Sequence, residues 1–177
     1  MVIFREEKFK QEALEAVARN MCIAARTAPK ARGIDLLEIA IAEGEDIPKL
    51  SAKMKEIGER ESHATFLRDA ESIKSAQLIV LIGTKIKVIG LKYCSFCGWQ
   101  NCEEAGKAGA ICAYNTGDLG IAIGSALSVA ADHRVDNRLM YSIGRAAVDL
   151  KFLGNDVKII YGIPLSATAK NPFFDRK

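Results

Sequence analysis

Hydrophobic positions in the first half of the chain alternate between helical spacing and short apolar runs. Phe9, Val17 and Met21 recur near helical spacing, and Pro29 and Gly33 follow as stop signals. Leu78–Ile82 is a β-branched run with the length of a buried strand. The patterns predict helices over residues 5–28, 47–62 and 66–76, and strands over residues 36–42, 78–82 and 85–91. The last of these strands leads directly to Cys94.

The second half continues this mixture. Residues 117–133 are apolar on nearly every side, which is typical of a helix in the core. Residues 136–153 predict an amphipathic helix that stops at Gly154, and residues 157–161 predict a strand that Gly162–Leu165 breaks. The adjacent Phe173 and Phe174 indicate that the polar tail docks onto something. We therefore expect one α+β domain over residues 1–177.

Composition and charge narrow the class of protein. The chain has 177 residues, 49% of them hydrophobic, which is enough for a substantial core. Its net charge is +3 and its basic residues are scattered among acids, so we expect no nucleic-acid partner. No apolar run approaches the roughly 20 residues that span a bilayer, and the start is charged after four residues, unlike a signal peptide. We expect a cytoplasmic protein without a membrane partner.

Four of the five cysteines lie within one short segment. Cys94, Cys97, Cys102 and Cys112 follow the spacing C-x2-C-x4-C-x9-C. In a reducing compartment, clustered cysteines more often bind metal than form disulfides. Gly98 lets the backbone approach inorganic sulfide. We therefore predict that residues 94–112 bind an iron–sulfur cluster through these four thiolates.

Residues around the cysteines suit this chemistry. Asn101 is a good helix N-cap, with Glu104 three residues on as in a capping box. Cys102 would then lie at a helix N-terminus, where free amides favour a thiolate. Phe96 and Trp99 could shield the cluster from water.

Other interpretations of the segment stay open. Zinc uses the same ligands, although zinc ribbons and fingers usually separate their ligand pairs by a dozen or more residues, and here only four separate Cys97 from Cys102. Redox thiols and inert cysteines are further alternatives.

Outside the segment, candidate residues carry weaker signals. Arg26, Lys30 and Arg32 surround an Ala-Pro loop and could hold a phosphate, although a solvated loop explains them as well. Cys22 lies in the first predicted helix and is interpreted as a small core residue. His63 and His133 have no partner at metal spacing and are expected at the surface or at helix ends.

Several stretches together resemble a prokaryotic family of uncharacterised ferredoxin-domain proteins, over almost the whole chain. They are Ala24–Gly33, the cysteine segment, Asp118–Ser125 and Gly162–Leu165. The cysteine segment is similar to the four-cysteine [4Fe–4S] domain of corrinoid iron–sulfur proteins, where the fourth cysteine usually lies further on. The resemblance implies a [4Fe–4S] cluster, with Cys112 as the ligand most in need of a test.

The surrounding frame resembles the nitroreductase fold. Ala28-Pro-Lys-Ala31 and Tyr161-Gly-Ile-Pro164 match an Ala-Pro-Ser-type loop and a closing Gly-Tyr-Pro-like turn, with Lys30 in place of the serine. Met1–Phe4 lacks the Arg-Ser-x-Arg segment that nitroreductases use for the flavin phosphate. The resemblance implies a mostly antiparallel sheet of about four to five strands flanked by helices, a homodimer, and flavin mononucleotide (FMN), for which Arg26, Lys30 and Arg32 are the candidate ligands.

The sequence thus favours a [4Fe–4S] electron-transfer protein of nitroreductase-like fold, with an unknown redox partner. One alternative is an FMN-dependent oxidoreductase in which the cluster is a relay. Another is a non-enzymatic module that zinc stabilises. No acid–base pair, Ser/His/Asp set or Gly-rich nucleotide loop specifies a reaction or a catalytic residue.

Overall fold

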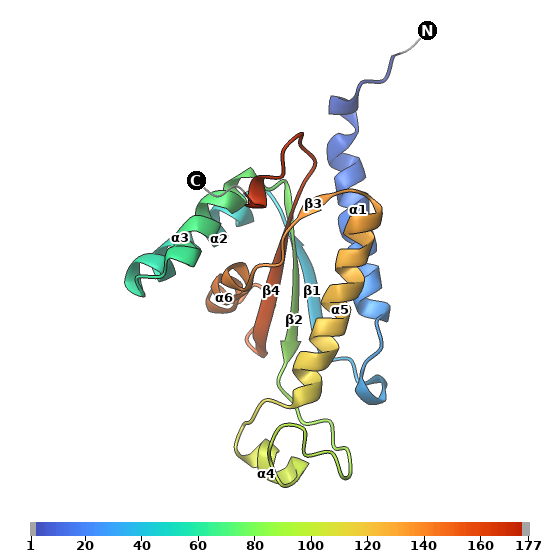
Figure 1. Ribbon diagram of the computed structural model, residues 1–177, viewed down its shortest axis with the longest axis vertical. Coiled ribbons are helices and arrows are strands. Elements are labelled where there is room, and N and C mark those ends of the chain that lie inside the picture. The colour runs from blue at the N-terminus through green and yellow to red at the C-terminus, as the bar shows by residue number, and fades with distance from the viewer. Residues whose placement is uncertain (1–2, 175–177) are drawn as a thin grey trace.

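A computed structural model describes residues 3–174 of the chain (Figure 1). Its helices are α1 (Lys10–Thr27), α2 (Asp46–Arg60), α3 (Ala64–Ser72), α4 (Cys102–Lys107), α5 (Ala113–Asp132) and α6 (Tyr141–Asp149). Its strands are β1 (Leu37–Ala42), β2 (Leu78–Lys85), β3 (Asp136–Asn137) and β4 (Val157–Ser166). Short 3-10 turns lie at Glu6–Lys8, Ala31–Gly33, Ile73–Ser75 and Pro172–Phe174.

The four strands form one antiparallel sheet in the order β1-β2-β4-β3. Strand β2 lies between its partners, with Ile82 opposite Ile39 of β1 and Tyr161 of β4. The prediction of an α+β fold with an antiparallel sheet of about four to five strands is confirmed.

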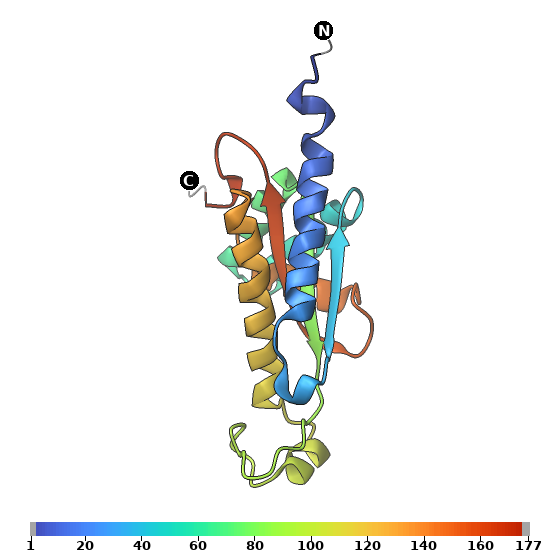
Figure 2. The same cartoon turned by 90° about the vertical axis from the view of Figure 1, so that its right-hand side faces the viewer.

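Helices cover both faces of the sheet, as Figures 1 and 2 show. Alternate residues of a strand point to opposite faces. Leu78, Val80 and Ile82 therefore pack against α1 and α5, while Ile79 and Leu81 pack into a second cluster with α2, α3 and α6. This explains why the β2 sequence is continuously apolar instead of alternating.

The strand predicted over residues 85–91 is wrong. Strand β2 continues to Lys85, and its register against β4 shifts between Thr84 and Lys85. Residues 86–91 have no strand partner and take irregular backbone, with Gly90 at a φ of 76°. Two of the apolar positions that suggested a strand, Val88 and Leu91, instead line the cavity that the cysteines share.

The strand predicted over residues 157–161 is too short, since β4 runs through Pro164 to Ser166. Gly162 exchanges both backbone hydrogen bonds with Met140, on the β3 side of β4. Backbone groups along an antiparallel strand alternate sides, so Pro164 also faces the β3 side. There it falls opposite the stretch between β3 and Met140, where no ladder bond is needed, and its missing N–H costs nothing.

The helix predicted over residues 136–153 begins too early and ends too late. Asp136 and Asn137 form β3, and helix α6 covers only Tyr141–Asp149. The polar Asp-Asn-Arg stretch therefore pairs with the end of β4 instead of starting the helix.

Helix α6 lies directly on β4. A Cβ atom built on Gly144 would overlap the carbonyl oxygen of Ile160, and one built on Gly162 would overlap the side chain of Ile143. Both positions therefore require glycine, because α6 contacts the β4 backbone at Gly144 and the Ile143 side chain packs directly on Gly162.

The tail docks as expected. Phe173 is 1% exposed and packs into the cluster with α2, α3 and α6. Arg138 donates a hydrogen bond to the Phe173 carbonyl at 2.9 Å, and its guanidinium lies 5.1 Å from the centre of the Phe174 ring.

Candidate functional site

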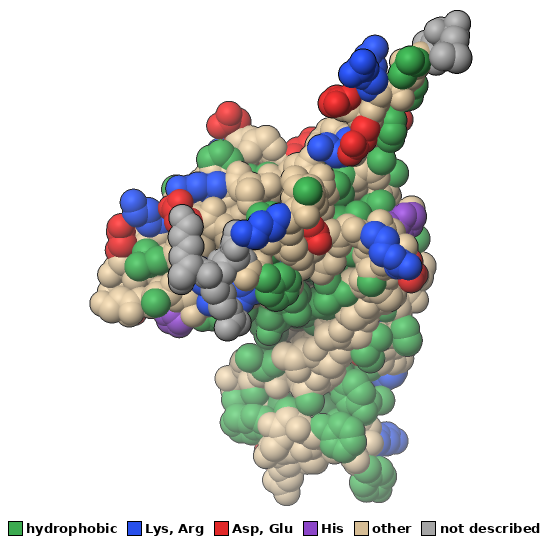
Figure 3. All heavy atoms as spheres, turned by 45° about the horizontal axis from the view of Figure 1, so that its top comes forward, with side chains coloured by type: hydrophobic (Ala, Val, Ile, Leu, Met, Phe, Trp, Pro, Cys, Tyr) green, Lys and Arg blue, Asp and Glu red, His purple; other side chains and the backbone are tan. Residues whose placement is uncertain are grey.

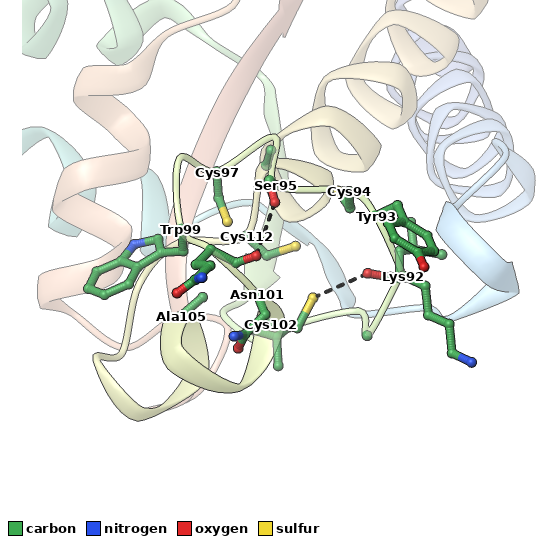
Figure 4. A pocket seen from close by; sticks show the side chains of 15 residues that line it. Lys92, Tyr93, Cys94, Ser95, Cys97, Trp99, Asn101, Cys102, Ala105 and Cys112 are labelled. Carbon is green, nitrogen blue, oxygen red and sulfur yellow. Dashed lines mark hydrogen bonds between the residues drawn. The ribbon is translucent and has the colours of Figure 1, made fainter.

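The four clustered cysteines lie together at one end of the sheet. Cys94, Cys97, Cys102 and Cys112 come from the segment between β2 and α5, and all four line one cavity of about 280 Å³. The sulfur atoms of Cys97, Cys102 and Cys112 face the same space in Figure 4. Cys112 is buried and the other three are half-buried.

Tight backbone turns bring the first two cysteines into this cavity. Tyr93 and Ser95 have φ angles of 54° and 50°, in the left-handed region that residues other than glycine rarely adopt. Gly98 has a φ of 81°. The hydroxyl of Ser95 donates to the Gln100 carbonyl at 3.2 Å, and the Gly98 amide donates to the Ser95 carbonyl at 2.9 Å. Left-handed non-glycine residues cost energy and cluster at functional sites. Here they surround Cys94.

Cys102 begins helix α4, as the sequence predicts. The Asn101 side chain caps this helix by accepting a hydrogen bond from the Glu104 amide at 2.9 Å. The Cys102 thiol donates to the Leu91 carbonyl at 3.8 Å. This contact connects the start of α4 to the residues that precede the cysteines.

The two aromatic residues of the segment have different surroundings. Trp99 lines the cysteine cavity. Phe96 does not line it, and instead stacks on Tyr114 of α5 with ring centroids 6.0 Å apart. Figure 3 shows hydrophobic side chains exposed over this end of the molecule, and Tyr93, Phe96 and Ile111 are among the exposed ones.

Asn115 holds the base of the segment, a role that the sequence analysis missed. Its side-chain oxygen accepts from the Lys87 amide at 3.0 Å, and its side-chain amide donates to the Lys87 carbonyl at 3.0 Å. Asn115 is 1% exposed. The available signal was a lone amide residue in the first turn of an apolar helix, where a buried polar side chain needs partners.

The three cations around the Ala-Pro loop are hydrogen-bonded to different parts of the chain. Lys30 Nζ donates to the carbonyls of Ala25, Arg26 and Ala28, at 3.2, 2.6 and 2.8 Å, and so satisfies the end of α1. Arg32 Nη1 donates to the Ile89 and Gly90 carbonyls at 3.1 and 3.4 Å. The assignment of these cations to a flavin phosphate stays a prediction.

Arg26 forms an ion pair beside the same loop. Its Nη1 lies 2.7 Å from Asp35 Oδ2 and donates to the Leu37 carbonyl at 2.9 Å. Burial alone would raise the pKa of Asp35, but the Arg26 hydrogen bond, the Leu37 amide and the charges of Arg26 and Lys30 together lower it. Arg26 thus fixes the entry to β1.

The remaining candidates lie apart from the cavity. Cys22 is half-buried on α1 and packs against the core, and burial raises the pKa of its thiol against the opposing effect of Arg26. His63 precedes α3, and His133 follows α5, which confirms both as helix-end residues. The His63 ring lies 3.1 Å from the Tyr141 hydroxyl.

The four thiols fit a cluster by their chemistry. Among residues 3–174, no group of three or more His, Cys, Asp or Glu side chains converges closely enough to hold one metal ion. A [4Fe–4S] cluster binds each of four thiolates through a different iron, so it does not need all sulfurs to meet at one point. A cavity lined by four cysteines and otherwise by mostly apolar contacts suits such a group.

Solved structures with the same architecture define the class of the fold. Nitroreductase CinD from Lactococcus lactis, in complex with chloramphenicol, is 14% identical with a TM-score of 0.63, covering 88% of this chain and 79% of that one. A nitroreductase with bound FMN from Desulfitobacterium hafniense is 13% identical with a TM-score of 0.61, covering 92% and 83%. The fold is nitroreductase-like.

Sequence comparison identifies the family. The model of a family described as "Uncharacterized protein containing a ferredoxin domain (DUF2148)" matches residues 108–176, a stretch that includes Cys112 but not the other three clustered cysteines. An uncharacterized protein of Archaeoglobus fulgidus is 42% identical over 184 residues, covering 99% of this chain and 98% of its own length. The chain belongs to this family of ferredoxin-domain proteins, which confirms the first resemblance. Within residues 3–174, no helix is both long enough and apolar enough to cross a bilayer.

Proposed function

We propose that this protein carries electrons through one [4Fe–4S] cluster bound by Cys94, Cys97, Cys102 and Cys112. The observation that carries the proposal is that all four thiols line a single cavity, although 18 positions of the sequence separate the first from the last. The family's ferredoxin domain supports a redox role.

The side chains around the cavity have separate tasks in this proposal. A bound cluster would take up and release one electron at a time. The four thiolates hold it, and the proton that Cys102 shares with the Leu91 carbonyl leaves when its sulfur binds metal. Trp99 and the buried Cys112 limit water at the cavity. Because four protein ligands occupy all four irons, we assign the cluster to electron transfer and not to substrate binding.

The cluster proposal is tested by anaerobic purification of the full chain, followed by iron, sulfide, zinc and flavin analysis and an absorbance spectrum. We expect four irons and four sulfides per chain, with a broad thiolate-to-iron absorbance that bleaches on reduction. A colourless protein with stoichiometric zinc would overturn the proposal in favour of the zinc-stabilised module.

An FMN-dependent oxidoreductase is the second candidate, because fold neighbours include proteins with bound FMN. In that case Arg26, Lys30 and Arg32 would have to exchange their present acceptors for the flavin phosphate. Stoichiometric FMN in the purified protein, lost when these three residues are changed to Ala together, would support this candidate.

We further propose a cytoplasmic homodimer. Ile23 on α1 and Ile121 on α5 are 61% and 49% exposed, on the two helices that cover one face of the sheet. Sedimentation equilibrium tests this assignment, and a monomer at micromolar concentration would refute it.

A further inference from the structure

A second cavity adjoins the cysteine cavity. It has a volume of about 420 Å³ and lies between the Pro29–Ala31 loop, Phe96 and the first turns of α5. Cavities of this size are typical of small-molecule sites. Ala113 lines both cavities, and it directly follows Cys112. The two cavities therefore share a wall.

The walls of the second cavity are mainly apolar and aromatic. Phe96 and Tyr114 stack with their ring planes 21° apart, and the half-exposed Ile121 of α5 lines the open side of the cavity. Gly117 contributes no side chain, and a Cβ built there would meet nothing within 4 Å. Stacked rings beside an open, flat space favour another flat ring.

The charged groups of this cavity balance each other. Lys30 lines it, but the three ammonium protons match the three backbone carbonyls that accept from Nζ. Asp118 also lines it, is 8% exposed, and accepts from the Ala31 amide at 3.1 Å. With one positive and one negative group, both already hydrogen-bonded, the walls offer no spare donor set for an anion.

We propose that this second cavity binds an uncharged, planar aromatic ring beside the cluster, as the small molecule with which the protein exchanges electrons. Its role as the electron partner rests on the proposed function, whereas ring binding itself does not. Naphthoquinones, through their fused benzene ring, and the isoalloxazine ring without its phosphate share this chemistry. A phosphate group would add nothing to the affinity, which separates this site from an FMN site built on Arg26, Lys30 and Arg32.

The experiment measures binding of three probes to the full chain by equilibrium dialysis under anaerobic conditions. Menadione represents a quinone, lumiflavin represents a flavin ring without phosphate, and FMN represents the anionic form. We expect at least one of the two uncharged probes to bind, and FMN to bind no more than threefold tighter than lumiflavin. FMN binding more than tenfold tighter than lumiflavin, or binding of neither uncharged probe, would overturn the proposal.

Two glycines of α5 provide a matched pair of variants. Gly117→Leu places a side chain inside the cavity, and we expect it to weaken binding of the ring at least tenfold. Gly120→Leu places the same side chain on the exposed side of the same helix, outside the cavity lining, and should change binding less than twofold. Leucine favours a helix over glycine, so both variants should fold. Equal effects of the two variants would contradict the assignment.

Two further readouts separate the possible failures. Iron and sulfide content of the same samples tests the cluster, so ring binding by an iron-free protein would refute the proposed function alone. Sedimentation of Gly117→Leu tests whether this cavity instead receives a second copy of the chain. A dimer that Gly117→Leu converts to monomer, without ring binding to the unaltered protein, would assign the cavity to subunit contact.

Discussion

The Asn115 side chain joins the start of α5 to the residues leading into the cysteines. Its two hydrogen bonds satisfy the backbone N–H and the backbone carbonyl of Lys87, which lies 28 positions earlier in the chain. A buried side-chain amide that makes both hydrogen bonds fixes the relative position of the two segments more specifically than apolar contacts alone do.

Replacing Asn115 with Ala should therefore destabilise the chain and loosen the cysteine cavity. We expect the free energy of unfolding to fall by about 1–3 kcal/mol, because backbone groups of Lys87 lose their partners. Urea titration gives this value, and iron content reports on the cavity. Thr116→Ala is the control, since its hydroxyl bonds only to Ala113 within the same helix. Similar losses in the two variants would show that Asn115 has no special role.

Cys112 is the proposed ligand that most needs a direct test. Cys112→Ser should remove at least half of the bound iron and sulfide, because a hydroxyl replaces one of four thiolates. Cys22→Ser should leave both contents unchanged, since Cys22 lies on α1 and packs against the core, outside the cavity lining. Anaerobic iron and sulfide analysis decides the matter, and full iron content in Cys112→Ser would remove Cys112 from the ligand set.

At the level of elements, the periodicity of hydrophobic residues predicted most helices and strands. It failed where hydrogen bonding to a neighbouring strand determines whether a segment is a strand. The sequence shows that residues 86–91 are mostly apolar but not that β4 provides no partner for them. It shows Pro164 but not that this residue lies opposite the stretch between β3 and Met140, where no ladder bond is needed. Both outcomes depend on neighbours distant in sequence, which local patterns do not encode.

The candidate site likewise has local features that the sequence predicted and long-range contacts that it did not. Cysteine spacing and the Asn101 cap are local, and the sequence predicted that they lie together around the start of α4. The contacts of Asn115 with Lys87, and of Arg32 with Ile89, join separate parts of the chain. Three separated stretches of the chain line the second cavity, so no sequence motif predicted it.

The contact between α6 and β4 leads to a prediction at this scale. Gly144→Ala should lower the free energy of unfolding by about 2–3 kcal/mol, because the added methyl group overlaps the Ile160 carbonyl and separates helix from strand. Gly124→Ala is the matched control on α5, where the new Cβ meets nothing within 4 Å. There we expect a gain of about 0.5–1 kcal/mol from helix propensity. Chemical denaturation measures both, and equal signs would contradict the structural explanation.

For the whole molecule, the cysteine segment lies outside the two hydrophobic clusters that hold the sheet and its helices together. As described over residues 3–174, neither cluster includes a residue between Ile82 and Leu119. Figure 1 shows α4 beyond the end of the sheet, at the opposite end of the molecule from the start of α1.

Removing the proposed cluster by chelation and oxidation should therefore leave the sheet and its helices folded. We expect the far-ultraviolet circular dichroism to keep most of its amplitude, because both clusters keep their buried area. Limited proteolysis of the same sample should cut first within residues 92–111, since bound metal no longer holds that segment. Cooperative loss of all secondary structure on cluster removal would show that the metal organises the entire fold.

The hydrogen bonds between Asn115 and Lys87 also bear on how such a protein can arise. They join the two ends of the stretch 88–114 whatever that stretch contains. Because each doubling of a flexible loop costs only about 0.6 kcal/mol in closure entropy, long and short versions of this stretch are nearly equivalent to the frame. An insertion or deletion within this stretch can therefore add or remove the proposed redox centre while the sheet and its helices keep their connection.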